Sequence, residues 1–416
     1  MVIKSNSLRI GVIFGGRSGE HEVSLMSARS VLAALDPQKY IVTQIGITHA
    51  GQWLAGENVL DALVAGDPEL RTFVPESELR TFVPEPELRT FVPEPELRSN
   101  LRNLRNLHTL SPVALLPDPT HKGLQVLRTT DSGQILETLT DLDVVFPVLH
   151  GTFGEDGTLQ GLLELADLAY VGAGVVGSAV GMDKGIFKDV MHYQGIPVVE
   201  SIVVLRSEIE TNMPDVLSKA ESCSVGPYPL FVKPANLGSS VGITKCLNRS
   251  DLVEGLLEAA RFDRRVLVER GVNGREIEVS VLGNDDPQAS VPGEVLPSRE
   301  FYSYEAKYVD GTSGLLIPAP IPEQTADRVR ELAVRAYRAI DCAGMARVDF
   351  LLDKDSGELY LNEVNTIPGF TQISMYPKLW EASGLPYPAL VDRLVELALE
   401  RKAERDRTER RFQRGG

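Results

Sequence analysis

The sequence has few cysteines and no long apolar segment. Its 416 residues include three cysteines, Cys223, Cys246 and Cys342, which are too few and too scattered for a disulfide framework or a zinc knuckle. This usage favours free thiols in a reducing compartment. No apolar run approaches the roughly 18 residues that a membrane-spanning helix needs, and the first residues lack the apolar core and cleavage site of a signal peptide. We therefore expect a cytoplasmic protein with no membrane partner.

Positive charge is also scarce. The chain has 42 Lys and Arg residues against 58 Asp and Glu residues, so its formal net charge is −16. This balance argues against a general surface for nucleic acid or anionic membranes, although it is compatible with a local basic pocket. A hydrophobic fraction of 43% and a charged fraction of 24% are typical of a globular protein. The length suggests two or three domains.

The chain opens with a βαβ pattern. Residues 8–14 form an apolar run before a Gly-Gly pair, residues 24–35 carry apolar side chains at helical spacing, and residues 41–47 predict a second strand. This order predicts a doubly wound sheet, whose ligands gather at the carboxyl ends of the strands. Glu22 lies at such an end. A carboxylate at a helix start is also favoured by the helix dipole alone, so its sequence position leaves both interpretations open.

Residues 67–99 interrupt this pattern with a nonapeptide repeat. ELRTFVPES is followed by two copies of ELRTFVPEP and a partial fourth unit. A proline in every unit excludes a continuous helix, and nine residues are too few for a helical solenoid unit. We interpret the segment as an extended or disordered insertion without a catalytic role, with a partner-binding tract as the alternative.

Glycine-rich turns follow two later strands. Strand 143–149 leads into HGTFGEDGTLQG, and strand 228–232 leads into KPANLGSSVGITK, a candidate flap whose backbone N–H groups could close over phosphates. Lys233 would supply fixed positive charge there. The GAGVVG segment at 172–177 has G-x-G-x-x-G spacing, but it comes late in the sheet and no acidic strand end follows about 20 residues on, so we do not interpret it as a dinucleotide site. The sequence contains no G-x-x-x-x-G-K-[ST] phosphate loop.

The strongest chemical signal is ARVDFLLDKDSGELYLNEVNT, which begins at residue 346. Apolar residues alternate on both sides of an Asp-Ser-Gly turn and predict a hairpin. If the hairpin closes on an odd-numbered loop centred on that serine, Arg347 pairs with Asn365. The same register pairs Asp349 with Glu363, with Cβ atoms about 5 Å apart. Two carboxylates that close need a cation or a proton between them, and an oxygen-only donor set suits Mg²⁺. An ordinary hairpin with a polar outer face is the alternative.

The remaining elements are less specific. Residues 266–269 predict a strand that ends in a carboxylate suited to a base or a sugar, and residues 322–340 predict a helix. Between them, residues 301–315 form a long loop without periodicity, as lids and binding loops often do. The last helix ends in the charged tail ERKAERDRTERRFQRGG, which we expect to be frayed and solvated.

In this order the motifs resemble those of the D-alanine–D-alanine ligases of the ATP-grasp superfamily. The likeness rests on GGRSGEHEVSL, HGTFGEDGTLQG, MDK, VKPANLGSSVG, VLVE, EAKY, ARVDF and NEVNTIPGFT, and it covers nearly the whole chain apart from the insertion and the last few residues. It implies an ATP-grasp fold of the α/β (α+β) class with three domains. These are an N-terminal doubly wound parallel sheet (1–172) and two α+β domains (173–276 and 277–416) that clasp ATP.

The resemblance also implies the reaction. ATP phosphorylates the carboxylate of one D-alanine, the amine of a second D-alanine attacks the acyl phosphate, and phosphate leaves, which supplies D-alanyl-D-alanine for peptidoglycan precursors. The implied ATP-binding residues are Lys184, Lys233, Ser240, Glu269, Glu276, Phe301 and Lys307. The implied ligands of two Mg²⁺ ions, with Mn²⁺ as an alternative, are Asp349, Glu363 and Asn365. The implied catalytic residues are Glu22, Ser239, Arg347, Gly369 and Ser374, and the implied substrate-binding residues are Glu22, His150, Tyr308, Ser374 and Met375.

Family positions also suggest individual roles. Glu22 matches the residue that holds the first ammonium group, and Ser239 the serine that links it to the lid tyrosine, Tyr308. Arg347 and the backbone N–H of Gly369 match the positions that stabilise the oxyanion. The general base for the second D-alanine is unassigned, and the family's habit of forming dimers predicts a homodimer.

Two departures and two alternatives accompany this resemblance. The family has no counterpart of the insertion, and Met375 stands where leucine is common, a volume-conserving change. A ligase of altered second-substrate specificity is one alternative, although the Lys307-Tyr308 pair resembles the dipeptide-forming members. A catalytically inactive nucleotide-binding module is the other, and the loss of a metal ligand or a lysine would favour it. Every family position that we compared carries a competent residue.

Overall fold

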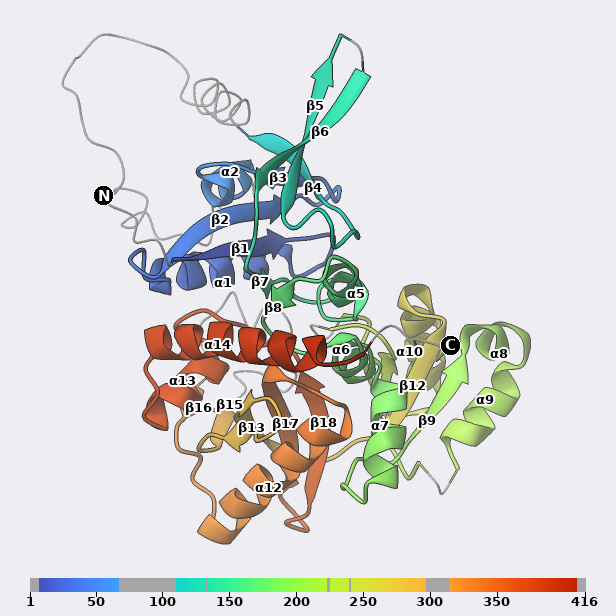
Figure 1. The fold of residues 1–416 in the computed structure, drawn as a ribbon. Coiled ribbons are helices and arrows are strands. Elements are labelled where there is room, and N and C mark those ends of the chain that lie inside the picture. Colours follow the sequence, from blue (N-terminus) through green and yellow to red (C-terminus); the bar gives the residue numbers. More distant parts are fainter. Residues whose placement is uncertain are drawn as a thin grey trace, which may run out of the picture.

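The computed structural model describes residues 7–66, 110–131, 133–222, 225–238, 241–296 and 314–409 (Figure 1). Several sequence expectations lie outside the described residues: those on the insertion 67–99, on all but the last two residues of the loop 301–315, and on Cys223, Ser239, Ser240, Phe301, Lys307 and Tyr308. No helix within the described ranges is long and apolar enough to cross a membrane. Cys246 and Cys342 are buried free thiols, as expected.

An eight-stranded sheet occupies the first part of the chain, in the order β6-β5-β4-β3-β2-β1-β7-β8 (Figure 1). The apolar run predicted at 8–14 is β1 (Leu8–Gly15), which pairs in parallel with β2 (Tyr40–Ile47) and β7 (Val144–Val148). β8 (Ala169–Tyr170) continues this parallel half. The helices of this region are α1 (His21–Ala34), α2 (Val59–Gly66) and α5 (Thr158–Leu165).

The other half of this sheet is antiparallel. Its strands are β3 (Trp53–Ala55), β4 (Ser111–Leu115), β5 (Leu124–Thr130) and β6 (Gly133–Thr140). The doubly wound parallel pattern is therefore confined to four strands. The opening βαβ pattern gave no sign of the antiparallel half. Thr130 of β5 pairs with Gly133 of β6, so only two residues connect the strands, and so short a connection can join only antiparallel neighbours.

A four-stranded antiparallel sheet follows, in the order β11-β10-β12-β9, with a hydrophobic core of its own. Its strands are β9 (Ser201–Leu205), β10 (Leu230–Pro234), β11 (Thr244–Cys246) and β12 (Arg265–Arg270). The helices of this part of the chain are α6 (Val175–Met182), α7 (Lys184–Tyr193), α8 (Arg206–Thr211), α9 (Met213–Ala220) and α10 (Arg249–Phe262). The GAGVVG segment lies where the chain leaves the first sheet, and its Gly174 is the N-cap of α6.

The third sheet has the order β16-β15-β13-β17-β18, with β14 paired to β13. Its strands are β13 (Gly274–Gly283), β14 (Gln288–Ala289), β15 (Gly293–Leu296), β16 (Gly314–Leu316), β17 (Gly344–Asp353) and β18 (Leu359–Asn365). The helices are α12 (Glu323–Ala339), α13 (Met375–Ala382) and α14 (Tyr387–Asp406). The three sheets accord with the expected fold class, while the exact domain boundaries stay predictions.

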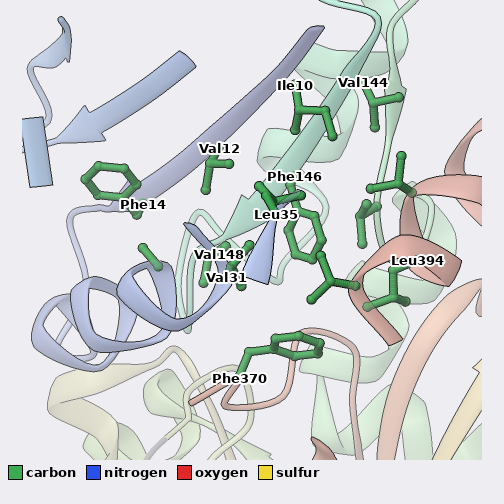
Figure 2. Packing of buried hydrophobic residues seen from close by; sticks show 14 of the residues in the cluster. Ile10, Val12, Phe14, Val31, Leu35, Val144, Phe146, Val148, Phe370 and Leu394 are labelled. Carbon is green, nitrogen blue, oxygen red and sulfur yellow. The ribbon is translucent and has the colours of Figure 1, made fainter. Parts of the chain in front are cut away.

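One hydrophobic core joins the first sheet to the C-terminal part of the chain (Figure 2). Side chains of β1 and β7, such as Val12 and Phe146, share this core with Phe370 from the loop after β18 and Leu394 from α14. Burying such side chains stabilises the fold by about 1.5–3 kcal/mol each. The first and third sheets are therefore packed as one unit.

The C-terminal tail differs from its predicted state. Helix α14 continues through residue 406, and the guanidinium of Arg401 lies 4.1 Å from the ring centroid of Tyr170. Arg405 donates a hydrogen bond to Asp167 at 3.2 Å. The expected fraying is wrong through residue 406, because cation–π and ionic contacts hold Arg401 and Arg405 against the first part of the chain. Most of the other described tail side chains are exposed, as expected.

Candidate active site

A cavity of about 790 Å³ is lined by residues of the second and third sheets and by residues of the loops that follow β1 and β7 of the first sheet. Its lining contains ten of the predicted site residues: His150, Lys184, Lys233, Glu269, Glu276, Arg347, Asp349, Glu363, Asn365 and Gly369. Glu22, Ser374 and Met375 are also described by the structure but are not part of this lining. The cavity therefore brings together most of the described candidates, from segments far apart in the sequence.

Strands β17 and β18 place the predicted metal ligands side by side. Asp349 is the direct cross-strand partner of Glu363, and Arg347 is the partner of Asn365, so the predicted register is confirmed. The route to this register was not predicted. The pairing shifts by one residue directly after Asp349, where Asn362 is the extra residue of a β-bulge.

The three side chains form an oxygen-rich donor set. Asn365 Nδ2 donates to Asp349 Oδ2 at 3.0 Å and lies 3.4 Å from Glu363 Oε1. Rotating the carboxamide by half a turn presents its oxygen instead. Two carboxylates and one carboxamide oxygen fit a hard divalent cation such as Mg²⁺. In the described part of the chain no three His, Cys, Asp or Glu side chains are grouped to hold a metal, so the fit depends on the carboxamide of Asn365 as the third donor.

Arg347 lies between two carboxylates. Its Nε and Nη2 donate to Asp349 Oδ1 and Oδ2 at 2.8 and 2.7 Å, and its Nε is 3.0 Å from Glu278 Oε2. Glu278 on β13 is the direct cross-strand partner of Asp349. We call Glu278, Arg347 and Asp349 the Arg347 cluster. Its paired, charge-assisted hydrogen bonds fix the plane of the guanidinium at the cavity wall.

Glu269 lies between two lysines. Lys233 Nζ donates to Glu269 Oε1 at 2.7 Å, and Lys188 Nζ is 2.5 Å from Glu269 Oε2. Burial acts to raise the pKa of Glu269, but the charges and hydrogen bonds of the two lysines outweigh it and lower this pKa to about 2. Glu269 is therefore ionised at neutral pH. We call Lys188, Glu269 and Lys233 the Glu269 cluster.

The MDK motif combines a helix cap with a cavity lysine. Asp183 is the N-cap of α7, where its carboxylate accepts the N–H of Ile186 at 2.9 Å and also pairs with Arg265. Lys184 follows as the first residue of the helix, and its Nζ donates to the carbonyl of Leu237, at the start of the predicted flap, at 2.6 Å. Burial is the main cause of the lowered pKa of Lys184. The motif thus places a positive charge beside the flap.

His150 is buried where the first and third sheets meet. Its Nδ1 is 2.9 Å from the carbonyl oxygen of Ile367, which can only accept, so Nδ1 carries a proton. Its Nε2 is 3.1 Å from Ser27 Oγ, and Glu155 Oε1 lies 3.6 Å from Nδ1. Burial acts to lower the pKa of His150, but the carboxylates of Glu155 and Glu20 outweigh it and raise this pKa above its ordinary value.

The two carboxylates near the start of α1 have different surroundings. Glu22 Oε1 lies 3.2 Å from Nε2 of His49, whose ring stacks on His21 at a centroid distance of 3.8 Å. Glu20 lines the cavity, and a Cβ atom at Gly151 would lie 2.6 Å from its Oε2. Because Gly151 also has a φ of 73°, a side chain there would be strained as well as crowded.

The two predicted residues near α13 offer different groups. Ser374 is the N-cap of the helix, and its hydroxyl lies 2.7 Å from that of Thr371. The side chain of Met375 is buried against Val295 and Leu379. At the first position of the helix, Met375 can offer a ligand its backbone N–H rather than its side chain.

Comparisons with known proteins agree with this geometry. The chain matches the family model for the D-ala D-ala ligase N-terminus over residues 9–173 and the model for the D-ala D-ala ligase C-terminus over residues 190–396. A D-alanine–D-alanine ligase of Heliobacterium modesticaldum is 48% identical over 398 residues, which is 96% of each chain. One of Natranaerobius thermophilus is 44% identical over 405 residues, which is 97% of this chain and 98% of the relative. The chain belongs to the D-alanine–D-alanine ligase family.

Solved structures of this ligase family support the fold. The structure of the D-alanine–D-alanine ligase from Coxiella burnetii has a TM-score of 0.73 and 34% identity, and the match covers 97% of both chains. The structure of a D-Ala:D-Ser ligase from Enterococcus faecalis has a TM-score of 0.75 and 33% identity over 94% of this chain and 99% of that one. The ATP-grasp fold and the ATP-dependent formation of D-alanyl-D-alanine for cell-wall synthesis are confirmed as the family's properties.

Four residues of this ligase fold were missed by the sequence analysis. Glu20 and Glu278 line the cavity, Glu155 faces His150, and Lys188 faces Glu269. Two of them left a usable signal. Glu278 follows a predicted ATP-binding glutamate by two residues, which puts both on one face of a strand, and Lys188 follows Lys184 by one helical turn.

Proposed function

We propose that this chain joins two D-alanine molecules with ATP inside the cavity described above, using the residues that the family resemblance identified. The observation that carries the proposal is the convergence of ten predicted residues on one cavity, with Asp349 and Glu363 directly paired. Phosphoryl transfer needs positioning and charge neutralisation more than covalent catalysis, and this cavity offers both.

ATP binds at the wall that carries the Glu269 cluster. Lys184 and Lys233 hold phosphate oxygens, and the carboxylates of Glu269 and Glu276 hold the base and the sugar. Support for these roles comes from the two lysines, which line the same cavity as the acidic hairpin. The further ATP contacts expected from Ser240, Phe301 and Lys307 lie outside the described residues.

Two Mg²⁺ ions, with Mn²⁺ as an alternative, bind to Asp349, Glu363 and Asn365. When bound, they neutralise the charge that builds up on the phosphate oxygens. The support is the all-oxygen donor set of the hairpin, with its two carboxylates directly opposed. Arg347 beside them adds a fixed positive charge that the chain itself supplies.

The D-alanines bind at the end of the cavity near His150. The sequence analysis predicted Glu22 as the partner of the first ammonium group, but Glu22 is absent from the cavity lining. We assign this role to Glu20, which lines the cavity and whose charge acts on His150. His150 itself lies beside the second D-alanine. Ser374 and the backbone N–H of Met375 hold the terminal carboxylate. Arg347 and the backbone N–H of Gly369 donate to the oxyanion of the tetrahedral intermediate.

The reaction proceeds in two steps. A carboxylate oxygen of the first D-alanine attacks the γ-phosphorus, the bond to ADP breaks, and an acyl phosphate forms. The neutral amine of the second D-alanine then attacks the acyl carbon, loses a proton, and expels phosphate. Holding the reactants together in one cavity also favours attack by the amine over attack by water. The homodimer and the cytoplasmic location stay predictions.

Phosphate release tests this proposal directly. The assay contains ATP, Mg²⁺ and D-alanine, and is repeated with D-lactate or D-serine as the second substrate. We expect release and dipeptide formation with D-alanine alone. The structural similarity to a D-Ala:D-Ser ligase makes altered second-substrate specificity the second candidate, and efficient release only in the presence of D-serine would establish it. Tight ATP binding without release on any substrate would indicate a nucleotide-binding module.

A further inference from the structure

Lys188 is a buried lysine that the proposed mechanism does not use. Among the described residues it is the only buried lysine, with 5% of its surface exposed. Its Nζ is 2.5 Å from Glu269 Oε2 and donates to the carbonyl of Val199 at 3.1 Å. Burial lowers the pKa of Lys188. Burying a lysine is unfavourable unless the charge has a partner, so its place beside Glu269 calls for an explanation.

The two lysines on Glu269 differ in what can reach them. Lys233 lines the cavity, whereas Lys188 is absent from the cavity wall and approaches Glu269 from α7. Each lysine takes a different carboxylate oxygen, Oε1 for Lys233 and Oε2 for Lys188. A ligand in the cavity can therefore compete for Lys233 but has no access to Lys188.

This asymmetry matters when a nucleotide binds. A phosphate group that draws Lys233 away takes a cation from a carboxylate that is 2% exposed. A buried carboxylate left without a counter-ion is strongly destabilising. With Lys188 in place, Glu269 keeps one cation and one oriented oxygen while Lys233 moves.

We propose that Lys188 is a positioning residue for ATP binding: it is the permanent counter-ion of Glu269, and it frees Lys233 to bind the phosphates of the nucleotide. The inference rests on the proposed roles of Glu269 and Lys233 as nucleotide ligands. It assigns a function to a residue that touches neither substrate nor metal. A purely structural ion pair is the competing explanation, and it predicts a loss of stability without a selective loss of nucleotide affinity.

The substitution Lys188→Met separates these explanations. With a single cation left, Glu269 retains Lys233, so the Kd for ADP and the KM for ATP should rise about tenfold. The kcat and the KM for D-alanine should change by less than about threefold, because the reacting end of the cavity is untouched. Lys188→Arg keeps the charge and should recover most of the nucleotide affinity.

Arg405→Met is the matched control. Arg405 also forms a partly buried ion pair, with Asp167 at 3.2 Å, but it lies on α14 and is absent from the cavity lining. ADP binding is measured by calorimetry in the presence of Mg²⁺, together with the melting temperature of each variant. We expect both variants to have a lower melting temperature than the wild type, and only Lys188→Met to bind ADP more weakly. Equal ADP affinity in Lys188→Met and the wild type would overturn the proposal.

A second variant covers the case in which Lys188→Met does not fold. The double substitution Lys188→Met, Glu269→Gln removes both buried charges. Lys233 then has no ion pair with residue 269 to break before it binds phosphate. The double variant should therefore bind inorganic tripolyphosphate as tightly as the wild type does, and weaker binding would overturn the proposal. If the wild type itself bound no ADP, the proposed function would fail along with this inference. If the wild type bound ADP and Lys188→Met bound it equally well, only the inference would fail.

Discussion

The two charged clusters of the cavity have opposite polarity. In the Glu269 cluster an anion lies between two cations, and in the Arg347 cluster a cation lies between two anions. The first therefore carries a net positive charge that suits phosphate groups, whereas the second, with Glu363 opposite Asp349, carries a net negative charge that suits metal cations. The charge pattern alone orients a nucleotide–metal complex in the cavity.

The clusters also differ in whether a bound ligand can displace the partners of the central charged residue, Glu269 or Arg347. Lys188 is withdrawn from the cavity, so one partner of Glu269 stays in place whatever binds. All three members of the Arg347 cluster line the cavity. A cation that binds Asp349 takes a partner from Arg347, which leaves Glu278 to hold the guanidinium. The nucleotide end of the cavity, at the Glu269 cluster, thus keeps one ion pair whatever binds. At the reaction end, at the Arg347 cluster, the bound ligands determine which ion pairs form.

Removing the charge of a predicted metal ligand should have the largest effect on turnover. Glu363→Gln keeps the shape of the side chain but removes a carboxylate that no neighbouring donor replaces. We expect turnover to fall by at least about a thousandfold, since metal ligands act on the transferring phosphate. Phosphate release at saturating ATP and D-alanine measures this, with the melting temperature as a control for folding. Retention of most activity would show that Glu363 is not a metal ligand.

Changing the central cation of the Arg347 cluster should have the next largest effect. Arg347→Lys keeps a positive charge but loses the paired hydrogen bonds to Asp349, so kcat should fall by about 10²–10³-fold. ADP affinity should stay close to that of the wild type, because the Glu269 cluster is intact. A parallel loss of ADP affinity would mean that the two clusters are not independent.

The outer anion of the same cluster should matter less. Glu278→Gln removes the ion pair at 3.0 Å but leaves both hydrogen bonds between Arg347 and Asp349. We expect kcat to fall about tenfold with little change in the KM for ATP. The double variant Glu278→Gln, Arg347→Lys should lose less than the product of the two single losses, since the residues act together. If the losses in the double variant were fully additive in free energy, Glu278 would not act through Arg347.

Several parts of this arrangement were predictable from the sequence. The alternation of apolar residues around Asp-Ser-Gly predicted the hairpin, and the opposition of Asp349 and Glu363 followed from it. The register came out right although its stated reason was wrong, because the bulge at Asn362 supplies the one-residue shift that an odd-numbered loop would have supplied. A bulge depends on contacts with the neighbouring strand, which local periodicity does not report.

The remaining parts depended on tertiary contacts. The C-terminal tail has the composition of a solvated end, yet Arg401 and Arg405 are held by residues more than 200 positions earlier in the chain. Lys188 follows Lys184 by one helical turn, but its burial depends on its ion pair with Glu269 of β12, far later in the chain. Long-range pairing of this kind is not visible in one sequence.

Acid should weaken the Glu269 cluster in a way that can be measured without substrate. The pKa of Glu269 is lowered from its ordinary 4.5 to about 2, so its contribution to stability is complete above pH 4.5 and is lost as the pH falls toward 2. The double variant Lys188→Met, Glu269→Gln lacks this contribution. Its free energy of unfolding should therefore fall less steeply than that of the wild type between about pH 5 and 2. Equal slopes in urea titrations would contradict the lowered pKa.

Deleting residues 69–95, three whole repeats, should have the smallest effect on either cluster. The flanking elements are α2, which packs against β2 of the first sheet, and β4 of the same sheet, and no described residue from 22 to 149 lines the cavity. Doubling the length of a flexible chain connection costs only about 0.6 kcal/mol. We therefore expect kcat and the KM for ATP to stay within about twofold of the wild-type values. Phosphate release and ADP calorimetry on the shortened chain test this. A large fall in kcat with unchanged ADP affinity would link the insertion to the reaction end, and the opposite pattern would link it to the nucleotide end.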